Sequence, residues 1–216
     1  MEDYSSTKLK AKYLRYHFGV AILDLAGEGL SRVPDAVTEL TEVQELSLQE
    51  NKLTKLPTSI QKLNRLTWLH LRGNNLTELP AGIGDLKELS RLSVSNNQLV
   101  CLPTSIQKLN RLTWLYLRGN NLTELPAEIG DLKELSRLNV SNNQLVGLPT
   151  SIQKLKRLLG LYLDGNNLTE LPAGIGDLRE MRELGVSGNP LTVDAIKFAL
   201  KLEKRGLSTD IAGEDK

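Results

Sequence analysis

The sequence repeats itself every 23 residues, and this period limits the possible fold more than any other feature. Seven of the eight prolines keep the spacing, at Pro34, Pro57, Pro80, Pro103, Pro126, Pro149 and Pro172. A pair of aliphatic residues recurs in the same register in eight units, from Leu23/Leu25 to Leu184/Val186. A unit of this size cannot bury its own leucines. The units are therefore predicted to stack side by side as a solenoid.

Each unit reads L-x-x-L-x-L-x-x-N-x-L-x-x-L-P-x-x-I-x-x-L-x-x. The x-L-x-L-x part alternates with period two, which predicts a short strand with its leucines on one side. The asparagine that follows, such as Asn97, is predicted to satisfy backbone groups of adjacent units; only the first unit departs here, with Glu28. The run Ile60, Leu63, Leu66 has helical spacing and predicts a short helix or 3-10 turn on the opposite face.

This spelling closely resembles the leucine-rich repeat over about residues Val20 to Leu191. Its 23-residue L-P-x-x-I form is similar to the intracellular Ras-group class, which includes the Ras-suppressor, Shoc and Scribble types. The resemblance implies an α/β solenoid: a horseshoe with a parallel concave sheet and short helices or 3-10 turns on its convex side. It also implies protein partners of the small-GTPase, phosphatase or polarity-complex type, and no residue selects among these.

A stack of repeats exposes leucines at both ends unless caps cover them. Residues 1–19 are expected to form an N-terminal helical cap, with a basic helix from Ser6 to Phe18 that runs into a first strand at 21–25. Its apolar side is expected to hold Leu9, Tyr13, Leu14 and Tyr16. The eight repeats then occupy residues 20–191.

The C-terminal cap is predicted as a helix within residues 192–206, with Thr192 as its N-cap and Gly206 as its stop. Ile196, Ala199 and Leu200 are expected to cover the last repeat. Residues 207–216 are predicted to be a flexible tail. With both caps, the segment is expected to fold alone as a monomer.

Charge and cysteine content exclude several classes of partner. The chain carries 27 basic and 26 acidic residues, so no general attraction to nucleic acid or anionic membrane is expected. The single cysteine, Cys101, cannot form an internal disulfide, which favours a reducing compartment. No apolar run approaches the ~20 residues that span a bilayer, and the N-terminus lacks the features of a signal peptide. These features predict a soluble cytoplasmic protein without membrane insertion.

No motif for catalysis, metal or cofactor binding is present. The sequence has no phosphate-binding G-x-x-x-x-G-K-[ST], no G-x-S-x-G and no His/Cys cluster with metal spacing. Its two histidines, His17 and His70, fall in different structural contexts. Cys101 precedes an L-P step, where an exposed, unreactive thiol is expected. We therefore predict no enzymatic activity and no cofactor.

The departures from the repeat gather on the outward positions of the strands. Aromatic residues make up only 4% of the chain, yet both tryptophans and two of the five tyrosines fall on this face. The predicted partner-binding residues are Trp68, His70, Arg72, Arg91, Trp114, Tyr116, Arg118, Arg137 and Tyr162. Parallel strands lie ~4.8 Å apart, so Arg91 is expected beside both indoles in cation–π contact. Exposed Trp, Tyr and Arg are typical of binding hot spots; the alternative is that they only pack on one another.

A longer period of two units is superimposed on the first. The segments Leu56–Cys101 and Leu102–Gly147 differ only at His70/Tyr116, Gly82/Glu128, Ser93/Asn139 and Cys101/Gly147. This near-identity indicates either recent duplication or deliberate idealisation.

The predicted function is a non-catalytic signalling scaffold that binds a protein on its concave face. One alternative is innate-type recognition of a microbial glycan or lipid, in which Trp and Tyr stack on sugar rings. The other is a synthetic or consensus-like scaffold without a native ligand.

Overall fold

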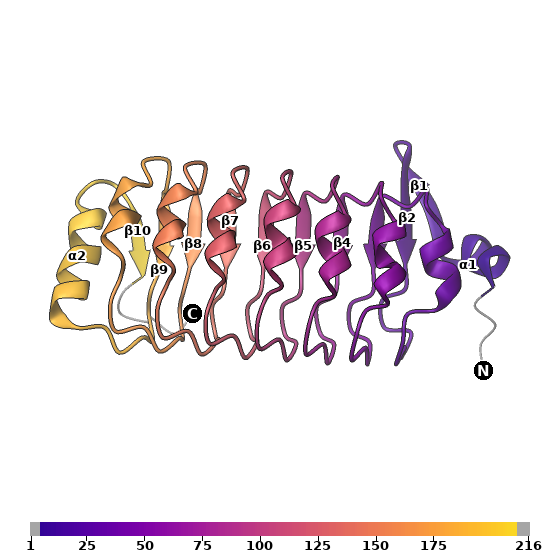
Figure 1. Ribbon diagram of the computed structural model, residues 1–216, viewed down its shortest axis with the longest axis horizontal. Helices are drawn as coiled ribbons and strands as arrows, with labels where there is room; N and C mark the ends of the chain where they lie inside the picture. The colour runs from indigo at the N-terminus through magenta and orange to yellow at the C-terminus, as the bar shows by residue number, and fades with distance from the viewer. Residues whose placement is uncertain (1–4, 211–216) are drawn as a thin grey trace.

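The computed structural model describes residues 5–210, in which the repeats follow one another along the long axis of the molecule (Figure 1). The ten strands form one sheet in the order of the sequence, from β1 to β10. Eight of them belong to the repeats: β2 (Val20–Asp24), β3 (Glu45–Ser47), β4 (Trp68–His70), β5 (Arg91–Ser93), β6 (Trp114–Tyr116), β7 (Arg137–Asn139), β8 (Gly160–Tyr162) and β9 (Glu183–Gly185). Neighbouring repeat strands are parallel and in register, so that Leu69 pairs with Leu92 and Leu92 with Leu115.

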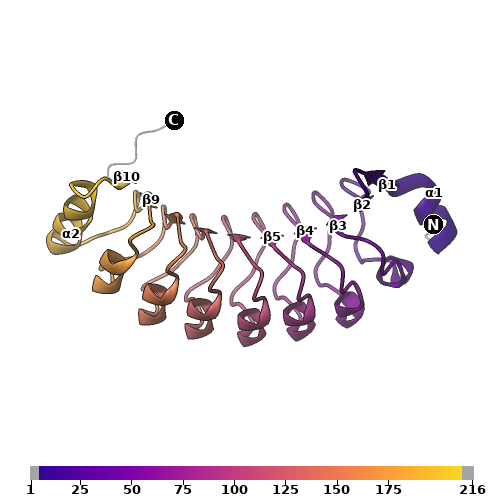
Figure 2. The ribbon, with the colours of Figure 1, turned by 90° about the horizontal axis from the view of Figure 1, so that it is seen from above.

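A 3-10 helix returns the chain along the other side of each of seven repeats. These helices are η1 (Asp35–Glu39), η2 (Thr58–Lys62), η3 (Ala81–Asp85), η4 (Thr104–Lys108), η5 (Ala127–Asp131), η6 (Thr150–Lys154) and η7 (Ala173–Asp177). Each begins after a proline in the extended region, and the first turn closes when the N–H of the residue three positions later, Val37 in η1 and an isoleucine in the others, bonds the proline carbonyl, as from Ile60 to Pro57 at 3.1 Å. The strands line the inner side of a shallow arc and the 3-10 helices its outer side (Figure 2). The predicted leucine-rich-repeat horseshoe is confirmed.

The core lies between the sheet and the 3-10 helices and consists almost entirely of aliphatic residues. In the third repeat, Leu66, Leu69, Leu71 and Leu76 are all fully buried. The strand alternation that buries Leu69 leaves its neighbours Trp68 and His70 half-exposed on the opposite face. The same pattern therefore fills the core and builds the concave surface.

The asparagine ladder satisfies the backbone where each strand turns away from the sheet. The Nδ2 group of Asn97 donates to the carbonyls of Val94 in its own repeat and Leu71 in the preceding one, at 3.1 and 2.9 Å. Its Oδ1 accepts from the backbone N–H of Leu76 at 3.0 Å. Buried amides with donors and acceptor all satisfied tie each repeat to the one before it, as the sequence predicts.

The N-terminal cap contains a hairpin where the sequence predicts only helix. Helix α1 (Ser6–Tyr13) ends early, and β1 (Leu14–His17) pairs antiparallel with β2. Phe18 and Gly19 join the two strands with φ values of 47° and 80°, the left-handed conformation that a two-residue hairpin turn requires. The predicted helix to Phe18 is therefore wrong after Tyr13. Tyr16 lies 66% exposed on β1 instead of covering the core, and the first repeat strand begins at Val20.

Helix α2 (Val193–Glu203) caps the other end of the stack. As predicted, Thr192 is its N-cap, because the Thr192 hydroxyl accepts from the backbone N–H of Ala195 at 3.3 Å. The buried face differs from the predicted one. Ala195, Ala199 and Leu202 are buried, whereas Leu200 is 42% exposed. Of the predicted residues, Ala199 is buried as expected and Ile196 is half-buried, and the prediction is wrong at Leu200, whose place on the buried face is taken by Leu202.

The chain then continues the sheet beyond the helix. Gly206, at φ 94°, turns the backbone after α2, as its predicted role as the stop requires. Strand β10 (Ser208–Asp210) pairs parallel with β9. The predicted flexible tail is therefore wrong at 208–210, because these residues pair with the last repeat strand; residues 211–216 lie outside the described range.

Candidate binding surface on the concave face

The nine predicted binding residues share one surface, which we call the concave surface: Trp68, His70, Arg72, Arg91, Trp114, Tyr116, Arg118, Arg137 and Tyr162. Seven of them lie on β4–β8 and are half-buried, and Arg72 and Arg118 follow β4 and β6 and are exposed. The parallel register brings the seven strand residues onto adjacent strands, with Trp68 beside Arg91 and Arg91 beside Trp114. Their placement follows the strand alternation; their role in binding stays a prediction.

The centre of the surface is a stack of one guanidinium between two indoles. The Arg91 Cζ atom lies 4.7 Å from the ring centroid of Trp68 and 4.0 Å from that of Trp114. Both distances fall within the range of cation–π attraction. This Trp–Arg–Trp stack has the side-by-side arrangement that the sequence predicts, and it holds the arginine head group in a fixed plane.

His70 extends the stack on the N-terminal side. Its ring centroid lies 3.9 Å from that of Trp68. Burial, opposed by the carboxylate of Asp24 and aided by the charge of Arg91, lowers the pKa of His70 to about 4. The imidazole is therefore neutral near pH 7. Tyr116 occupies the matching position two repeats later, with its ring centroid 6.1 Å from that of Trp114.

The C-terminal side of the surface is organised around Tyr162. Its hydroxyl donates to a carboxylate oxygen of Glu183 and accepts from Nη1 of Arg137 at 3.5 Å. Burial and the hydrogen bond to Glu183 together raise the pKa of Tyr162 to about 12. A Cβ atom at Gly160 would lie 2.9 Å from this hydroxyl, so a side chain there would displace the ring from its present position.

Sequence reasoning missed the contributions of Glu183 and Gly160. Both stand in the same column of outward strand positions as Trp68 and Arg91. A comparison of the residues at this outward position could have found them. Gly160 is followed two residues later on β8 by Tyr162, and the missing side chain lets the tyrosine ring lean over Gly160 towards Glu183. Two further carboxylates, those of Asp164 and Glu50, lie at the margins of the concave surface. Asp164 accepts from the Ser187 hydroxyl at 2.8 Å, and Glu50 lies 3.9 Å from Arg72.

The described part of the chain offers little for chemistry. Within residues 5–210, no group of three or more His, Cys, Asp or Glu side chains is placed to hold a metal ion. Cys101 is exposed, as predicted. None of the helices in this range is long and apolar enough to cross a membrane.

Comparison with known proteins identifies the repeat. A family model described as leucine-rich repeat region matches residues 1–113 and 103–204. The chain belongs to the leucine-rich-repeat family. A sequence comparison with curated proteins gives no match. Domains of this family are generally non-catalytic and commonly bind other proteins.

Solved leucine-rich-repeat structures superpose on most of the chain. A leucine-rich-repeat protein of Leptospira interrogans is 32% identical with a TM-score of 0.75, covering 90% of this chain and 55% of its own. The ectodomain of the Arabidopsis thaliana receptor kinase GASSHO1/SCHENGEN3, solved with Casparian strip integrity factor 2, is 33% identical with a TM-score of 0.72, covering 82% and 22%. The plant peptide hormone receptor RGFR1, solved with RGF2, is 28% identical with a TM-score of 0.70, covering 85% and 30%. This chain therefore spans between a fifth and somewhat over half of these proteins.

Proposed function

We propose that this leucine-rich-repeat chain is a non-catalytic scaffold that binds a protein partner through its concave surface. The observation that carries the proposal is the Trp–Arg–Trp stack. Two half-buried indoles and a guanidinium stand side by side at the centre of an open sheet face. Such residues dominate the binding energy of protein interfaces. Two structural neighbours were solved with peptide ligands, which supports the same use of the fold.

The cellular setting and the partner class are part of this proposal. The L-P-x-x-I spelling resembles the Ras-group class, whose partners are small GTPases, phosphatases and polarity-complex proteins. The lone Cys101 fits a reducing compartment. On these grounds we place the chain in cytoplasmic signalling. Glycan recognition is disfavoured, because Arg91 covers one face of each indole and His70 packs against Trp68, which leaves less aromatic surface for stacking on a sugar ring.

The proposal is tested by replacing the aromatic residues of the concave surface. The variant W68A/W114A/Y116A is compared with K62A/K108A/K154A, which changes three equivalent exposed residues of the convex repeats. Both variants and the unmodified chain are used to capture proteins from native extract for mass spectrometry. Circular dichroism and urea unfolding verify that both variants are folded.

We expect a set of proteins that the unmodified chain and the lysine variant recover and the aromatic variant loses. Truncation of a binding hot spot costs at least about 2 kcal/mol, or a factor of roughly 30 in affinity. If the aromatic variant recovers the same proteins in the same amounts, the concave surface is not the binding site.

A further inference from the structure

Charge along the concave surface follows a pattern that the net charge of +1 hides. Its centre is basic, with one arginine in each of four consecutive repeats: Arg72, Arg91, Arg118 and Arg137. Both ends are acidic. The equivalent outward positions carry Asp24 and Glu45 on β2 and β3 and Glu183 on β9, and Asp164 follows β8. A ligand that complements this surface is acidic in its middle.

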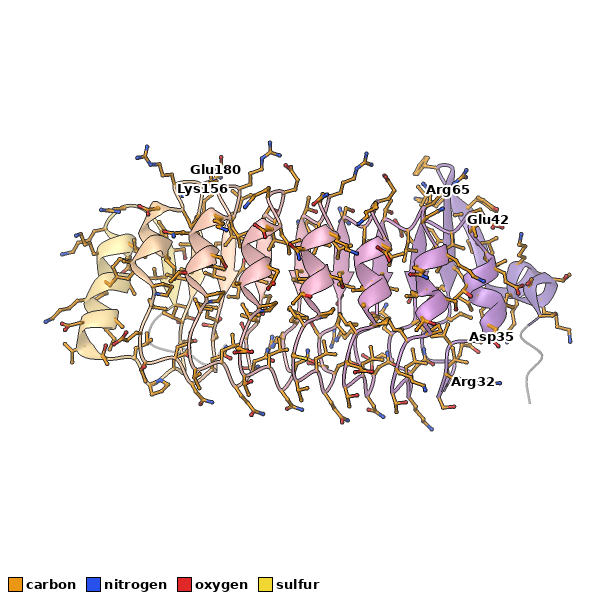
Figure 3. All side chains as sticks on the ribbon, in the orientation of Figure 1. Arg32, Asp35, Glu42, Arg65, Lys156 and Glu180 are labelled. Atoms are coloured by element: carbon orange, nitrogen blue, oxygen red, sulfur yellow. The ribbon has the colours of Figure 1, made fainter. Side chains whose placement is uncertain are left out.

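Two arginines outside the concave surface form ion pairs with carboxylates, whereas three of the four arginines of the concave surface form none within residues 5–210. Along the edge where the 3-10 helices lead into the strands, Arg111 pairs with Glu88 and Arg157 with Glu134. Figure 3 shows Glu42 and Arg65, an acidic and a basic residue of adjacent repeats, along the same edge. In the described range, by contrast, no carboxylate forms an ion pair with Arg91, Arg118 or Arg137.

The contacts of the concave arginines leave most of their donors uncommitted. Arg137 donates one hydrogen bond, to Tyr162 at 3.5 Å. Arg72 lies 3.9 Å from Glu50, and both side chains are more than half exposed, so this pair is weak. An Arg guanidinium presents five N–H donors. Four of these groups within four repeats form a strong site for anions.

The stack determines how an anion can approach Arg91. With an indole on each face, only the edge of the guanidinium remains open, and all its N–H donors lie in that plane. A planar edge that is already oriented favours bidentate binding of a carboxylate. The side-chain entropy that binding normally costs is reduced, because the stack already holds the guanidinium in place.

We infer that the concave surface binds an acidic peptide segment, with one carboxylate on the edge of Arg91 and others on Arg118 and Arg137. This inference rests on the proposed function and specifies its partner. Arg91 and Arg137 occupy the same outward position of β5 and β7, two strand spacings or about 10 Å apart, which an extended peptide covers in about three residues, and Arg118 follows the end of β6, which lies between them. Basic residues on either side of the acidic segment would face Glu45 and Glu183.

A single-stranded nucleic acid is also an anion that favours aromatic residues and arginines, but the surface suits it poorly. Base stacking needs open aromatic faces, and Arg91 occupies one face of Trp68 and one of Trp114. A polynucleotide also carries charge along its whole length. Beyond four repeats it would meet Glu45 on one side and Glu183 on the other.

The inference is tested by selecting random twelve-residue peptides, displayed on phage, against the immobilised chain. We expect enriched peptides with clustered Asp and Glu that W68A/W114A/Y116A no longer retains. One such peptide is then synthesised with a fluorescent label, and its affinity is measured by fluorescence polarisation. R91Q and R118Q should each weaken binding roughly tenfold or more, the usual cost of losing a charged hydrogen bond. R65Q, at an exposed arginine outside the concave surface (Figure 3), should leave the affinity unchanged.

The outcomes separate this inference from the proposed function. Selected peptides that depend on the aromatic residues but lack acidic side chains would overturn the inference and leave concave binding intact. The inference would also be overturned if acidic peptides bound R91Q and R118Q with the same affinity as the unmodified chain. It would likewise be overturned if the selection gave no peptide whose binding is lost in W68A/W114A/Y116A. If a labelled single-stranded oligonucleotide bound more tightly than the selected peptide and R91Q weakened that binding, the ligand of the surface would be a nucleic acid and not an acidic peptide. Unchanged protein capture by the aromatic variant would remove the proposed function itself.

Discussion

At the scale of single residues, the side chains of the concave surface order one another before any partner arrives. Arg91 is held by Trp68 and Trp114, and Trp68 also contacts the ring of His70. These contacts fix side chains that would otherwise lose conformational freedom on binding. They also bury His70 enough to change its protonation, which makes the packing measurable without a ligand.

We predict that His70→Tyr makes the stability of the chain less sensitive to acid. The pKa of His70 is about 4 in the folded chain and about 6.5 when unfolded. Between these values the unfolded state binds more protons, so stability falls as the pH decreases from 6.5 towards 4. Tyrosine occupies the matching position in the second copy, at Tyr116, and its side chain lacks the imidazole that takes up the proton. Urea unfolding at pH 7 and pH 4.5 should show a smaller loss of stability for the variant. Equal losses would contradict the burial of the imidazole.

All nine predicted binding residues lie on one face, because strand alternation alone determines which side chains point away from the core. The sequence predicted the contact of Arg91 with both indoles, but not the contacts of Tyr162. Leaning of Tyr162 across Gly160 towards Glu183 depends on the space left by a missing side chain, and periodicity carries no information about such space. The depressed pKa of His70 is likewise a consequence of packing between neighbouring strands.

At the scale of elements, the two-repeat period has a physical correlate in how adjacent 3-10 helices pack. A Cβ atom at Gly84 in η3 would lie 2.2 Å from the carbonyl oxygen of Ser105 in η4, and one at Gly130 would lie 2.4 Å from that of Ser151. The A-G-I-G-D helix η3 and the A-E-I-G-D helix η5 therefore each approach the following T-S-I-Q-K helix closely. Gly176 has the same motif but precedes the cap, and a Cβ there would make only ordinary contacts, with the Phe198 ring at 3.6 Å and Leu202 at 3.8 Å.

Gly84→Ala should therefore destabilise the chain by about 1–3 kcal/mol, the usual cost of overpacking a well-filled site. The matched variant Gly176→Ala should change stability by less than about 0.5 kcal/mol, because its methyl group makes ordinary contact. Urea midpoints of the two variants and the unmodified chain test this difference. Similar midpoints for both variants would show that the close approach of η3 and η4 does not constrain the repeat.

Elements inside the repeat were predictable, and so was the capping helix α2, whereas strands β1 and β10 at the two ends were not. A repeat strand is specified eight times, so one unusual residue cannot change its assignment. The hairpin of β1 and β2 occurs once, and the basic residues before it match a helix as well as a strand. The strand at Ser208–Asp210 forms because β9 presents an unpaired edge. That edge is a property of the stack and not of the segment that pairs with it.

At the scale of the whole molecule, the near-identity of Leu56–Cys101 and Leu102–Gly147 allows one of these two segments to be deleted without changing the contacts between the repeats that remain. Deletion of residues 102–147 joins Cys101 to Leu148, and the residues on each side of the new junction match those of the original one. The helix η3 then packs on η6, which has the same T-S-I-Q-K sequence as η4. Each repeat contacts only its neighbours, so the remaining interfaces are kept.

We predict that this shortened chain folds but loses the proposed acidic-peptide site. Trp114, Arg118 and Arg137 are removed, and Arg91 gains Gly160 as its strand neighbour in place of an indole. The urea m-value should fall by about a fifth, since it scales with the surface exposed on unfolding. Circular dichroism and urea unfolding measure the fold, and fluorescence polarisation with a selected acidic peptide measures binding. An unfolded product would contradict the nearest-neighbour description of the stack. Retained peptide affinity would place the acidic-peptide site outside the Trp–Arg–Trp stack.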